Sequence, residues 1–499
     1  MVSRRDFIKK GSLLAGSLVA GSNISNDNNT DAKTNIDQTA GIQPIRVSGR
    51  VVSGGRGVSN VQITDGVTVT ATGTDGRFDF MSTNQQQFVF MSVPTGYKIP
   101  KSRTGTAAFY HPLRPNNDNR MSVDFQLEKA DMDHTKHSFL VLADPQMLDQ
   151  EDMDLFHQQT VPDVIQTADE LALKDPFGIT CGDILFDDLS LFPQYEKGVS
   201  RTGIPFYQAL GNHDVEVDTL TDEDSDDTYI DYFGPPYYSF DRGEIHYIVL
   251  DDVFWFGQYI GYVTEKQLNW LKQDLSYVEE GKTVVTFLHI PAYTNQHKRN
   301  GQDNPSNSVV VTNRQLLYDI LAPYNSYLIS GHTHESEFLT NGGCEHHVAG
   351  AVCGAWWTGP VCADGTPRGY AIYDVDGGDL RWRYKSTGKP IDHQIRIYKP
   401  EQNGNDTDQL VANIWGADES WTVKWVEDGE PRGAMTQKTG KDPLAQKLYD
   451  GENKPEKHTW VNAWNTSHLY HAKPSSNAST VAVEATDRWG NSYRQTVAL

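Results

Sequence analysis

Mostly apolar runs alternate with amphipathic segments through the middle of the chain. The runs are four to six residues long and lie at 138–143, 177–181, 205–210, 246–250, 283–288 and 327–330. Short runs without polar alternation are typical of strands that are covered on both faces. Because helical patterns lie between these runs, the middle of the chain predicts an α/β layered core.

Two of the helical segments have a recognisable start. Thr264 and Gln267 mark the ends of one capping box, and Thr312 and Gln315 mark the ends of another. Apolar residues at helical spacing follow each box, and Pro323 ends the second segment. We therefore expect one helix to begin after Thr264 and another to begin after Thr312.

The chain on either side of this core is patterned as short strands. Asp-Gly pairs, which favour hairpin turns, occur at 65–66 and 75–76 before the core and at 428–429 after it. Apolar and polar residues alternate at 422–426 and again at 480–485. The predicted division is an N-terminal β-sandwich over 41–129, an α/β domain over 130–386 and a C-terminal β-rich domain over 387–499.

Residues 1–40 have the pattern of a targeting segment. A basic start with Arg4 and Arg5 precedes an apolar run at 13–20, which is too short to span a membrane. The paired arginines resemble a twin-arginine export signal, which implies a bacterial protein exported to the periplasm or beyond. A chance arginine pair is the alternative. Residues 23–38 are polar and predict a disordered spacer, and we expect no stable membrane span.

The chain is strongly acidic. It has 66 Asp and Glu against 43 Lys and Arg, which gives a net charge of −23. Such a field repels nucleic acid and anionic membrane surfaces, so we expect no nucleic-acid partner. An anionic substrate would need a locally positive site, and a metal cluster would supply one.

The four cysteines are too few for a disulfide scaffold. Three of them, Cys344, Cys353 and Cys362, lie within nineteen residues of the sequence, whereas Cys181 lies apart. One disulfide among these three is compatible with an oxidising compartment. The sequence leaves this pairing open, and it contains no Cys-x-x-Cys metal pattern.

Five of the apolar runs end in side chains that can bind a metal ion. These residues are Asp144 with Gln146, Asp183, Asn212 with His213 and Asp214, His289, and His332 with His334. In open α/β sheets ligands bind beyond the carboxyl ends of the strands, so the five tips should converge there. Glycines directly before Asp183, Asn212 and His332 fit sharp turns and close backbone approach. One such tip is weak evidence, but the ordered set predicts a metal site.

The order of these motifs resembles that of the calcineurin-like metallophosphoesterases over residues 139–384. The resemblance implies a four-layer sandwich core and two metal ions. Asp144, Gln146 and His334 would hold the first ion, Asn212, His289 and His332 would hold the second, and Asp183 would bridge them. The strands before the core resemble a transthyretin-like sandwich, and the whole chain resembles exported bacterial proteins of three parts.

Gln146 departs from the family pattern, which has Asp-x-His at the first tip. An amide oxygen is a harder and weaker donor than an imidazole. The two divalent ions implied by the resemblance are Mn, Fe or Zn, and we expect Mn to be favoured at the site that contains Gln146. The alternative is that the first site is vacant and the enzyme is impaired.

The site predicts hydrolysis by an activated water. Two divalent ions deprotonate a water molecule near neutral pH, and this water attacks phosphorus in line with the leaving group. His213 would protonate the leaving oxygen or stabilise the transition state, and Asp214 would orient His213. The expected reaction is hydrolysis of a phosphomonoester or phosphodiester without a covalent intermediate.

The sequence leaves the substrate open. A phosphorylated small molecule, a lipid headgroup or a glycan would suit the site, and the pair Trp356 and Trp357 would either pack in the core or stack on substrate. A catalytically degenerate surface protein that binds carbohydrate is the alternative. A nuclease would share the metals but needs a basic track. His213 favours the enzyme, because a binding module has no use for a general acid beside a full set of metal ligands.

Overall fold

The computed structural model describes residues 41–403, 408–452 and 454–499. Within it, Gln43–Leu499 forms one continuous unit. The predicted export signal and spacer at 1–40 lie outside the described residues, so both stay predictions. Among the described helices, none is long and apolar enough to cross a membrane.

Two central sheets contain the predicted strands. The first has the order β11-β10-β9-β20-β21, with three parallel strands followed by two antiparallel ones. Its strands are Phe206–Ala209, Phe177–Cys181, Lys136–Leu142, Gly369–Asp376 and Asp379–Ser386, in that order. The second has the order β12-β13-β16-β17-β19-β18, which is parallel from β13 to β19 and antiparallel at its two ends. Its strands are Tyr238–Arg242, Ile245–Val249, Thr283–Phe287, Asn325–Ser330, Cys344–Val348 and Glu337–Asn341.

Strand β9 is buried on both faces, as its apolar run predicts. Phe139 faces the second sheet, where its ring centroid lies 5.6 Å from that of Tyr247 and 5.8 Å from that of Phe287. Its neighbours Leu140 and Leu142 belong instead to a separate core cluster that contains helix residues. Successive side chains of a strand point to opposite faces, so one sequence run serves two hydrophobic layers.

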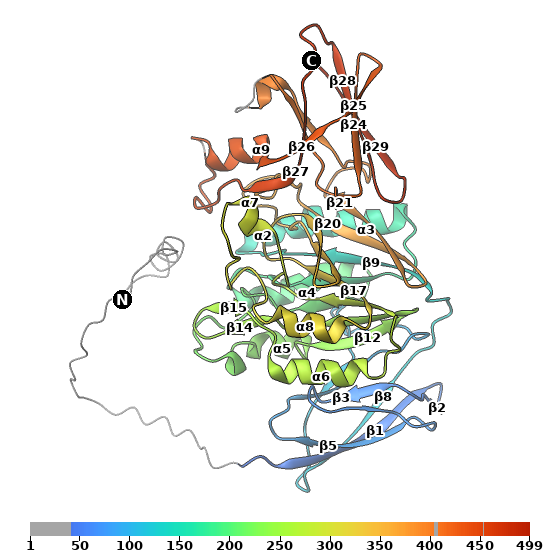
Figure 1. The fold of residues 1–499 in the computed structure, drawn as a ribbon. Helices are drawn as coiled ribbons and strands as arrows, with labels where there is room; N and C mark the ends of the chain where they lie inside the picture. Colours follow the sequence, from blue (N-terminus) through green and yellow to red (C-terminus); the bar gives the residue numbers. More distant parts are fainter. Residues whose placement is uncertain (1–40, 404–407, 453) are drawn as a thin grey trace, which may run out of the picture. The chain divides into compact units, whose positions relative to one another are not determined.

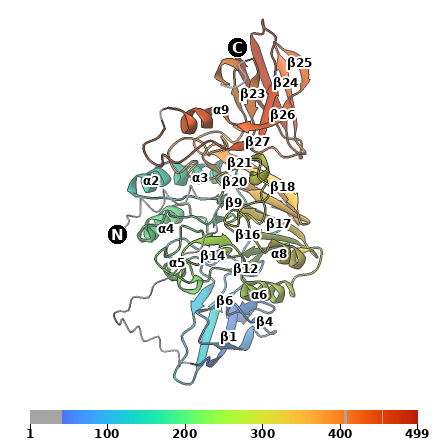
Figure 2. The same ribbon diagram turned by 60° about the vertical axis from the view of Figure 1, so that its left-hand side comes forward.

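Helices cover both outer faces. On the first sheet lie α2 (Gln150–Leu155), α3 (Val161–Glu170) and α4 (Phe192–Arg201), which share a core cluster with β9. On the second lie α6 (Glu265–Leu275) and α8 (Arg314–Leu321), whose leucines pack with that sheet. In both Figure 1 and Figure 2 the layers follow one another in space, with α3 outside β9 of the first sheet and α6 outside β17 of the second sheet. The four-layer prediction is confirmed.

One of the two helix starts differs from its prediction. The hydroxyl of Thr264 accepts a hydrogen bond from the Gln267 N–H, so the helix start predicted after Thr264 is confirmed. The reciprocal bond of a capping box is replaced, because the side-chain oxygen of Gln267 accepts from the Asp251 N–H. The second helix is preceded by Asn313 instead of Thr312. The Thr312 hydroxyl donates to the carbonyl of Gly261, a tertiary contact that competes with the local cap.

Two sheets lie in each flanking region. Before the core, β1, β2, β5 and β8 pair in one sheet and β3, β4, β6 and β7 in another. Their bounds are Pro44–Ser53, Arg56–Gly57, Arg77–Thr83, Arg120–Gln126, Gln62–Thr64, Val69–Ala71, Phe88–Met91 and Tyr110–Pro112. After the core, the orders are β22-β23-β27-β26 and β25-β24-β28-β29. Their bounds are Arg396–Tyr398, Leu410–Asn413, Asn465–Ala472, Thr436–Lys441, Glu430–Ala434, Thr422–Glu427, Thr480–Thr486 and Ser492–Ala498.

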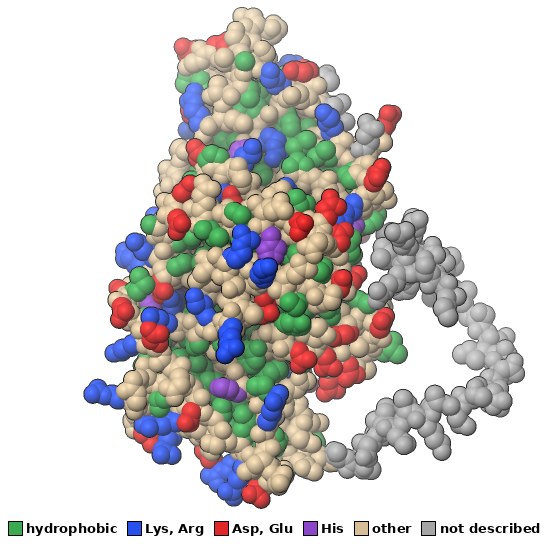
Figure 3. All heavy atoms as spheres, turned by 180° about the vertical axis from the view of Figure 1, so that it is seen from behind, with side chains coloured by type: hydrophobic (Ala, Val, Ile, Leu, Met, Phe, Trp, Pro, Cys, Tyr) green, Lys and Arg blue, Asp and Glu red, His purple; other side chains and the backbone are tan. Residues whose placement is uncertain are grey.

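Shorter elements complete the described chain. They are the hairpin β14 (Val253–Trp255) and β15 (Tyr259–Gly261), the helices α5 (Asp227–Phe233), α7 (Gln296–Arg299) and α9 (Pro443–Ala445), and the 3-10 or π-helical turns η1 (Phe156–Thr160), η2 (Leu189–Leu191), η3 (Asp222–Asp224), η4 (Pro400–Gln402) and η5 (Gln446–Asp450). The turn at 428–429 joins β24 to β25 and has positive φ at both residues, 47° and 88°, which is the backbone that an Asp-Gly pair favours. Acidic and basic side chains are interspersed over the face shown in Figure 3.

The cysteines do not pair. Cys181, Cys344, Cys353 and Cys362 are all free and buried. Burial raises the pKa of Cys353 and Cys362 well above the usual thiol value, so both act as small apolar side chains. The disulfide that the sequence left open is therefore not formed.

A buried charge network joins the N-terminal strands to the second sheet. The Ser92 hydroxyl lies 2.5 Å from the Ser239 hydroxyl, which donates to Asp274 at 2.7 Å. His246 lies 2.7 Å from Asp274 through Nε2 and 2.7 Å from Asp241 through Nδ1. Burial alone lowers the pKa of His246, but the two carboxylates outweigh it and raise the pKa from 6.5 to about 10. His246 is therefore charged in the folded protein, where its imidazolium pairs with the carboxylates of Asp274 and Asp241.

We expect His246→Gln to lower the free energy of unfolding by about 3–5 kcal/mol, because it leaves Asp274 buried without its cation. Because the folded pKa of His246 is raised from 6.5 to about 10, its contribution is fully present below pH 6.5 and is lost as the pH rises toward 10. Urea unfolding of wild type and variant across this range checks the prediction. His111→Gln, at an exposed histidine, is the control. A stability gap that did not shrink with rising pH would contradict it.

Candidate metal centre

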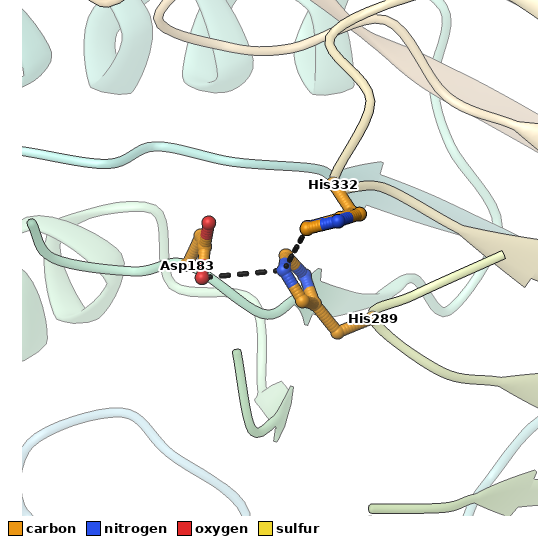
Figure 4. A group of neighbouring side chains, drawn as sticks. All are labelled: Asp183, His289 and His332. Atoms are coloured by element: carbon orange, nitrogen blue, oxygen red, sulfur yellow. Dashed lines mark hydrogen bonds and ion pairs between the residues drawn. The ribbon is translucent and has the colours of Figure 1, made fainter. Parts of the chain in front are cut away.

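The predicted metal ligands all follow the carboxyl ends of core strands. Asp144 and Gln146 follow β9, Asp183 follows β10, Asn212 follows β11, His289 follows β16, and His332 and His334 follow β17. Both sheets therefore deliver side chains to the same edge, as Figure 4 shows for Asp183, His289 and His332. The sequence prediction that these tips converge is correct.

The backbone at these tips is strained. Five of the residues have a left-handed backbone, with φ between 41° and 71°; they are Asp144, Gln146, Asp183, His332 and His334. Residues with a Cβ rarely adopt this conformation, and it costs about 1–3 kcal/mol each where it occurs. Such strain is concentrated at functional sites, and here it turns each side chain toward a common point.

Three glycines make room for the ligands. A Cβ on Gly211 would lie 1.8 Å from the Asp183 nitrogen, and one on Gly331 would lie 2.4 Å from Asp144 Oδ2. A Cβ on Gly182 would lie 2.4 Å from His289 Nδ1. The close backbone approach that the sequence predicts at these glycines is confirmed.

The first group of ligand atoms surrounds His289. Its Nε2 lies 3.2 Å from Asp183 Oδ1, 3.1 Å from Asn212 Oδ1 and 3.1 Å from His332 Nδ1. Ligand atoms of Asp183, His289 and His332 all lie within 4.8 Å of one another, close enough to hold one ion. An oxygen and nitrogen set of this kind suits Zn, Fe or Mn.

Each of the three histidines is oriented by a backbone carbonyl. His289 Nδ1 lies 2.9 Å from the carbonyl oxygen of Cys181, His332 Nε2 lies 2.8 Å from that of Ser308, and His334 Nδ1 lies 2.7 Å from that of Gly354. If these nitrogens carry the protons, the other ring nitrogen of each histidine presents a lone pair to the site. Metal-binding histidines are held in this way in most proteins.

The second group comprises Asp144, Gln146 and His334. His334 Nε2 lies 3.6 Å from Asp144 Oδ1 and is buried with no hydrogen-bond partner, and Gln146 Oε1 is also buried with none. The amide nitrogen of Gln146 donates to Asp183 Oδ2 at 2.8 Å. The two oxygens of Asp183 therefore face different groups of side chains. The buried Nε2 of His334, an acceptor without a donor, fits a cation, and Gln146 would have to turn its amide over to ligate the same ion through oxygen.

Burial sets the protonation of His332 and His334, whereas at His289 the carboxylates of Asp183 and Asp144 outweigh burial and raise the pKa to about 10, so this ring would release a proton on binding an ion. Burial lowers the pKa of His332 to about 3 and that of His334 to about 4, so both rings are neutral, as metal ligands must be. Burial raises the pKa of Asp144. Burial would also raise the pKa of Asp183, but His289 and His213 outweigh it and lower that pKa. The residues present therefore fit a bound divalent ion.

His213 lies at the edge of the group, with 26% of its side chain exposed. Its backbone N–H donates to Asp183 Oδ1 at 2.9 Å, and its Nδ1 lies 2.7 Å from Asp187 Oδ1. Burial lowers the pKa of His213, but Asp183 and Asp187 outweigh it and raise the pKa to about 9. The ring is thus fixed through Nδ1.

The predicted role of Asp214 is wrong. Its carboxylate is buried and accepts hydrogen bonds from the backbone N–H groups of Ile184, Leu185 and Gly211, at 2.9 to 3.1 Å. These bonds tie the loop after β10 to the loop after β11. The residue that orients His213 is Asp187, which sequence reasoning missed although it lies only four residues after Asp183.

Trp356 and Trp357 are both buried, each 8% exposed, which agrees with the core-packing alternative of the sequence. Trp357 is a core residue, whose indole N–H donates to the carbonyl of Pro145 at 2.8 Å. Trp356 stacks on the metal-ligand candidate His334, with ring centroids 4.1 Å apart and planes 19° apart. Trp356 therefore lies directly beside a candidate metal ligand, whereas Trp357 holds the backbone at Pro145, between Asp144 and Gln146.

Comparison with known proteins gives the same architecture. Models of the calcineurin-like phosphoesterase, of its N terminal and of its C terminal match residues 137–336, 45–130 and 346–493. The C-terminal match begins before β20, so it overlaps the predicted boundary at 386, which stays a prediction. No curated protein matches the chain.

Solved structures show weak similarity. A purple acid phosphatase from yellow lupin (Lupinus luteus) seeds is 11% identical with a TM-score of 0.37, over 65% of this chain and 67% of that one. A 5'-nucleotidase from Candida albicans is 12% identical with a TM-score of 0.30, over 50% of each chain. The phosphopantetheinyl hydrolase of Mycobacterium tuberculosis is 11% identical with a TM-score of 0.29, over 44% of this chain and 91% of that one. At these scores the comparisons assign no substrate.

Proposed function

We propose that this chain, which belongs to the calcineurin-like phosphoesterases with added N-terminal and C-terminal domains, hydrolyses phosphate monoesters or diesters with two divalent metal ions. One observation carries the proposal. Three histidines, of which His289 and His334 are buried and His332 is half-buried, each direct one ring nitrogen into the site while the other lies against a backbone carbonyl. A histidine that only packs in a core has no need of such a lone pair.

The candidate ligands would divide between two ions. Asn212, His289 and His332 would hold one, Asp144, Gln146 and His334 would hold the other, and Asp183 would bridge them with one oxygen toward each group. When bound, the two ions would supply a nucleophilic water at neutral pH and neutralise charge on the phosphate. The site thus offers positive charge to an anion although the chain is acidic overall.

His213 would act on the leaving group. Asp187 holds Nδ1, so Nε2 is the nitrogen available to donate a proton or a hydrogen bond to the departing oxygen. The backbone N–H of His213 fixes Asp183 Oδ1, which couples the position of the acid to that of the bridging carboxylate. This bond therefore joins the proposed proton donor on the loop after β11 to the proposed metal ligand on the loop after β10.

We further propose that the protein acts outside the cytoplasm, after export through the signal at 1–40. The substrate would be a phosphorylated small molecule, a lipid headgroup or a glycan. Purified full chain, stripped of metal and reloaded with Mn, Fe or Zn, is tested on monoester, diester and pyrophosphate substrates. We expect metal-dependent hydrolysis. Glycan binding by the same protein without any hydrolysis would favour the degenerate binding protein instead.

We expect Gln146→His to tighten the metal site that contains His334 and to shift its preference from Mn toward Zn or Fe. The physical reason is that an imidazole replaces a neutral amide, which in this structure presents nitrogen to Asp183. The gain should be about 10- to 100-fold in metal affinity. Titration of metal-stripped protein, wild type beside variant, measures it by calorimetry. Equal affinities and equal preference would show that Gln146 is not a ligand.

A further inference from the structure

A segment of the C-terminal domain, residues 454–464, lies against the candidate metal centre. Lys457 fastens it to the loop after β9, where its Nζ lies 3.1 Å from Asp149 Oδ2 and 2.5 Å from Asp152 Oδ1. Asp149 is also the N-cap of α2, and Asp152 is buried in that helix. The segment is therefore fixed to the same part of the core that carries Asp144.

This segment completes a series of aromatic contacts that begins at His213, the candidate general acid. Phe186 stacks on His213, with ring centroids 4.3 Å apart and planes 20° apart. His458, from the C-terminal segment, lies next to Phe186 at 5.4 Å. Phe186 is thus placed between the candidate proton donor and a residue of another domain.

A second arm begins at the metal-ligand candidate His334. Trp356 stacks on this ring at 4.1 Å, and Trp460 meets Trp356 edge to face at 4.5 Å. The two arms join where His458 lies 5.5 Å from Trp460. We call the four rings Phe186, His458, Trp460 and Trp356 the aromatic arc.

Trp460 differs from the rest of the arc because 42% of it is exposed, whereas Trp356 is 8% exposed. A large aromatic side chain that is held by neighbours and still open to solvent is a surface on which a ligand can pack. His458 has a left-handed backbone, with φ of 58°, so the turn that presents it and Trp460 is strained. Lys457 holds this strained turn in place.

We propose that the aromatic arc is the subsite for the leaving group of the substrate, and that it selects an ester whose leaving group is an aromatic or heteroaromatic ring. This inference rests on the proposed function. A leaving oxygen within hydrogen-bond reach of His213 brings the group attached to it next to Phe186. From there a flat ring can pack along the arc as far as Trp460, covering its exposed face. An alkyl group of similar volume lacks the π-face that such packing uses.

The first test compares two monoesters with leaving groups of similar acidity, phenyl phosphate and hexafluoroisopropyl phosphate. The measured quantity is the ratio of their kcat/KM values in the full-length, metal-loaded protein. Trp460→Leu should lower this aryl-to-alkyl ratio by about three- to tenfold, the effect of one aromatic contact. Lys457→Met should lower it in the same direction, because the segment loses its anchor. Trp421→Leu is the matched control, since Trp421 stacks on Tyr493 within the C-terminal domain.

The second test needs no catalysis. Calorimetry measures the binding of phenylphosphonate and cyclohexylphosphonate to the Mn-loaded protein, and we expect tighter binding of the phenyl compound to wild type, with the preference lost in Trp460→Leu. Preferential phenylphosphonate binding without hydrolysis of any ester would refute the proposed function and leave the aromatic subsite standing. Hydrolysis with an aryl-to-alkyl ratio that Trp460→Leu leaves unchanged would overturn the inference and leave the function standing. Preferential binding of glucose 1-phosphate over phenylphosphonate would assign the aromatic arc to sugars, and this result would also overturn the inference.

Discussion

Asp183→Asn will abolish hydrolysis and reduce the bound metal from two ions per chain to fewer than one. Asp183 is 2% exposed, and its two oxygens face different groups of ligand candidates. An amide removes the negative charge that both proposed ions share and leaves one oxygen ligand where the carboxylate offers two. Each loses attraction that is worth several kcal/mol, so kcat/KM should fall by a factor on the order of 10³ or more.

Elemental analysis of the purified variant, together with kcat/KM at saturating metal, tests this prediction. Asp188→Asn is the control, because Asp188 lies five residues away, is exposed and caps a short turn through the N–H of Ser190. The control should keep both its metal and its activity. A variant at 183 that kept two ions and near-normal turnover would remove Asp183 from the centre.

The ligand set could be predicted because strand ends carry it. A strand that is buried on both faces is a short apolar run, and a polar residue directly after such a run must lie at the sheet edge. Asp144, Asp183 and His289 were found in this way, and their glycine neighbours indicated the close approach that the structure contains. The layered α/β core follows from the same runs, since strands covered on both sides need a further layer on each face, whereas the four-layer order is implied by the resemblance to the family.

What could not be predicted depends on partners distant in sequence or on competing bonds. Asp214 follows His213 directly, but its carboxylate accepts hydrogen bonds from three backbone N–H groups of two loops. Asp187 holds the ring of His213 instead. The helix α8 begins after Asn313 instead of after Thr312 for a similar reason, because the hydroxyl of Thr312 donates a hydrogen bond to the carbonyl of Gly261. Periodicity describes neighbours along the chain, and it carries no signal for such bonds.

The C-terminal segment is the clearest case. No pattern in residues 454–464 connects them to a catalytic site more than a hundred residues earlier in the sequence. Lys457 and Trp460 acquire their roles only because the fold brings them beside α2 and Trp356. A domain that sequence analysis assigned no chemistry therefore supplies part of the wall around the candidate centre.

His213→Ala should lower turnover by about 10²–10⁴, the usual contribution of a general acid, while the metal content stays normal. The loss should disappear for esters with very acidic leaving groups, which need no proton.

Asp187→Asn should give a smaller loss with the same dependence on the leaving group, because His213 can still donate a proton but its Nδ1 loses the carboxylate that holds it. Asp214→Asn should behave differently and lower thermal stability, because its carboxylate holds two loops together. Brønsted plots and melting curves for the three variants separate these roles. An equal loss for every leaving group in His213→Ala would show that the ring stabilises charge and donates no proton.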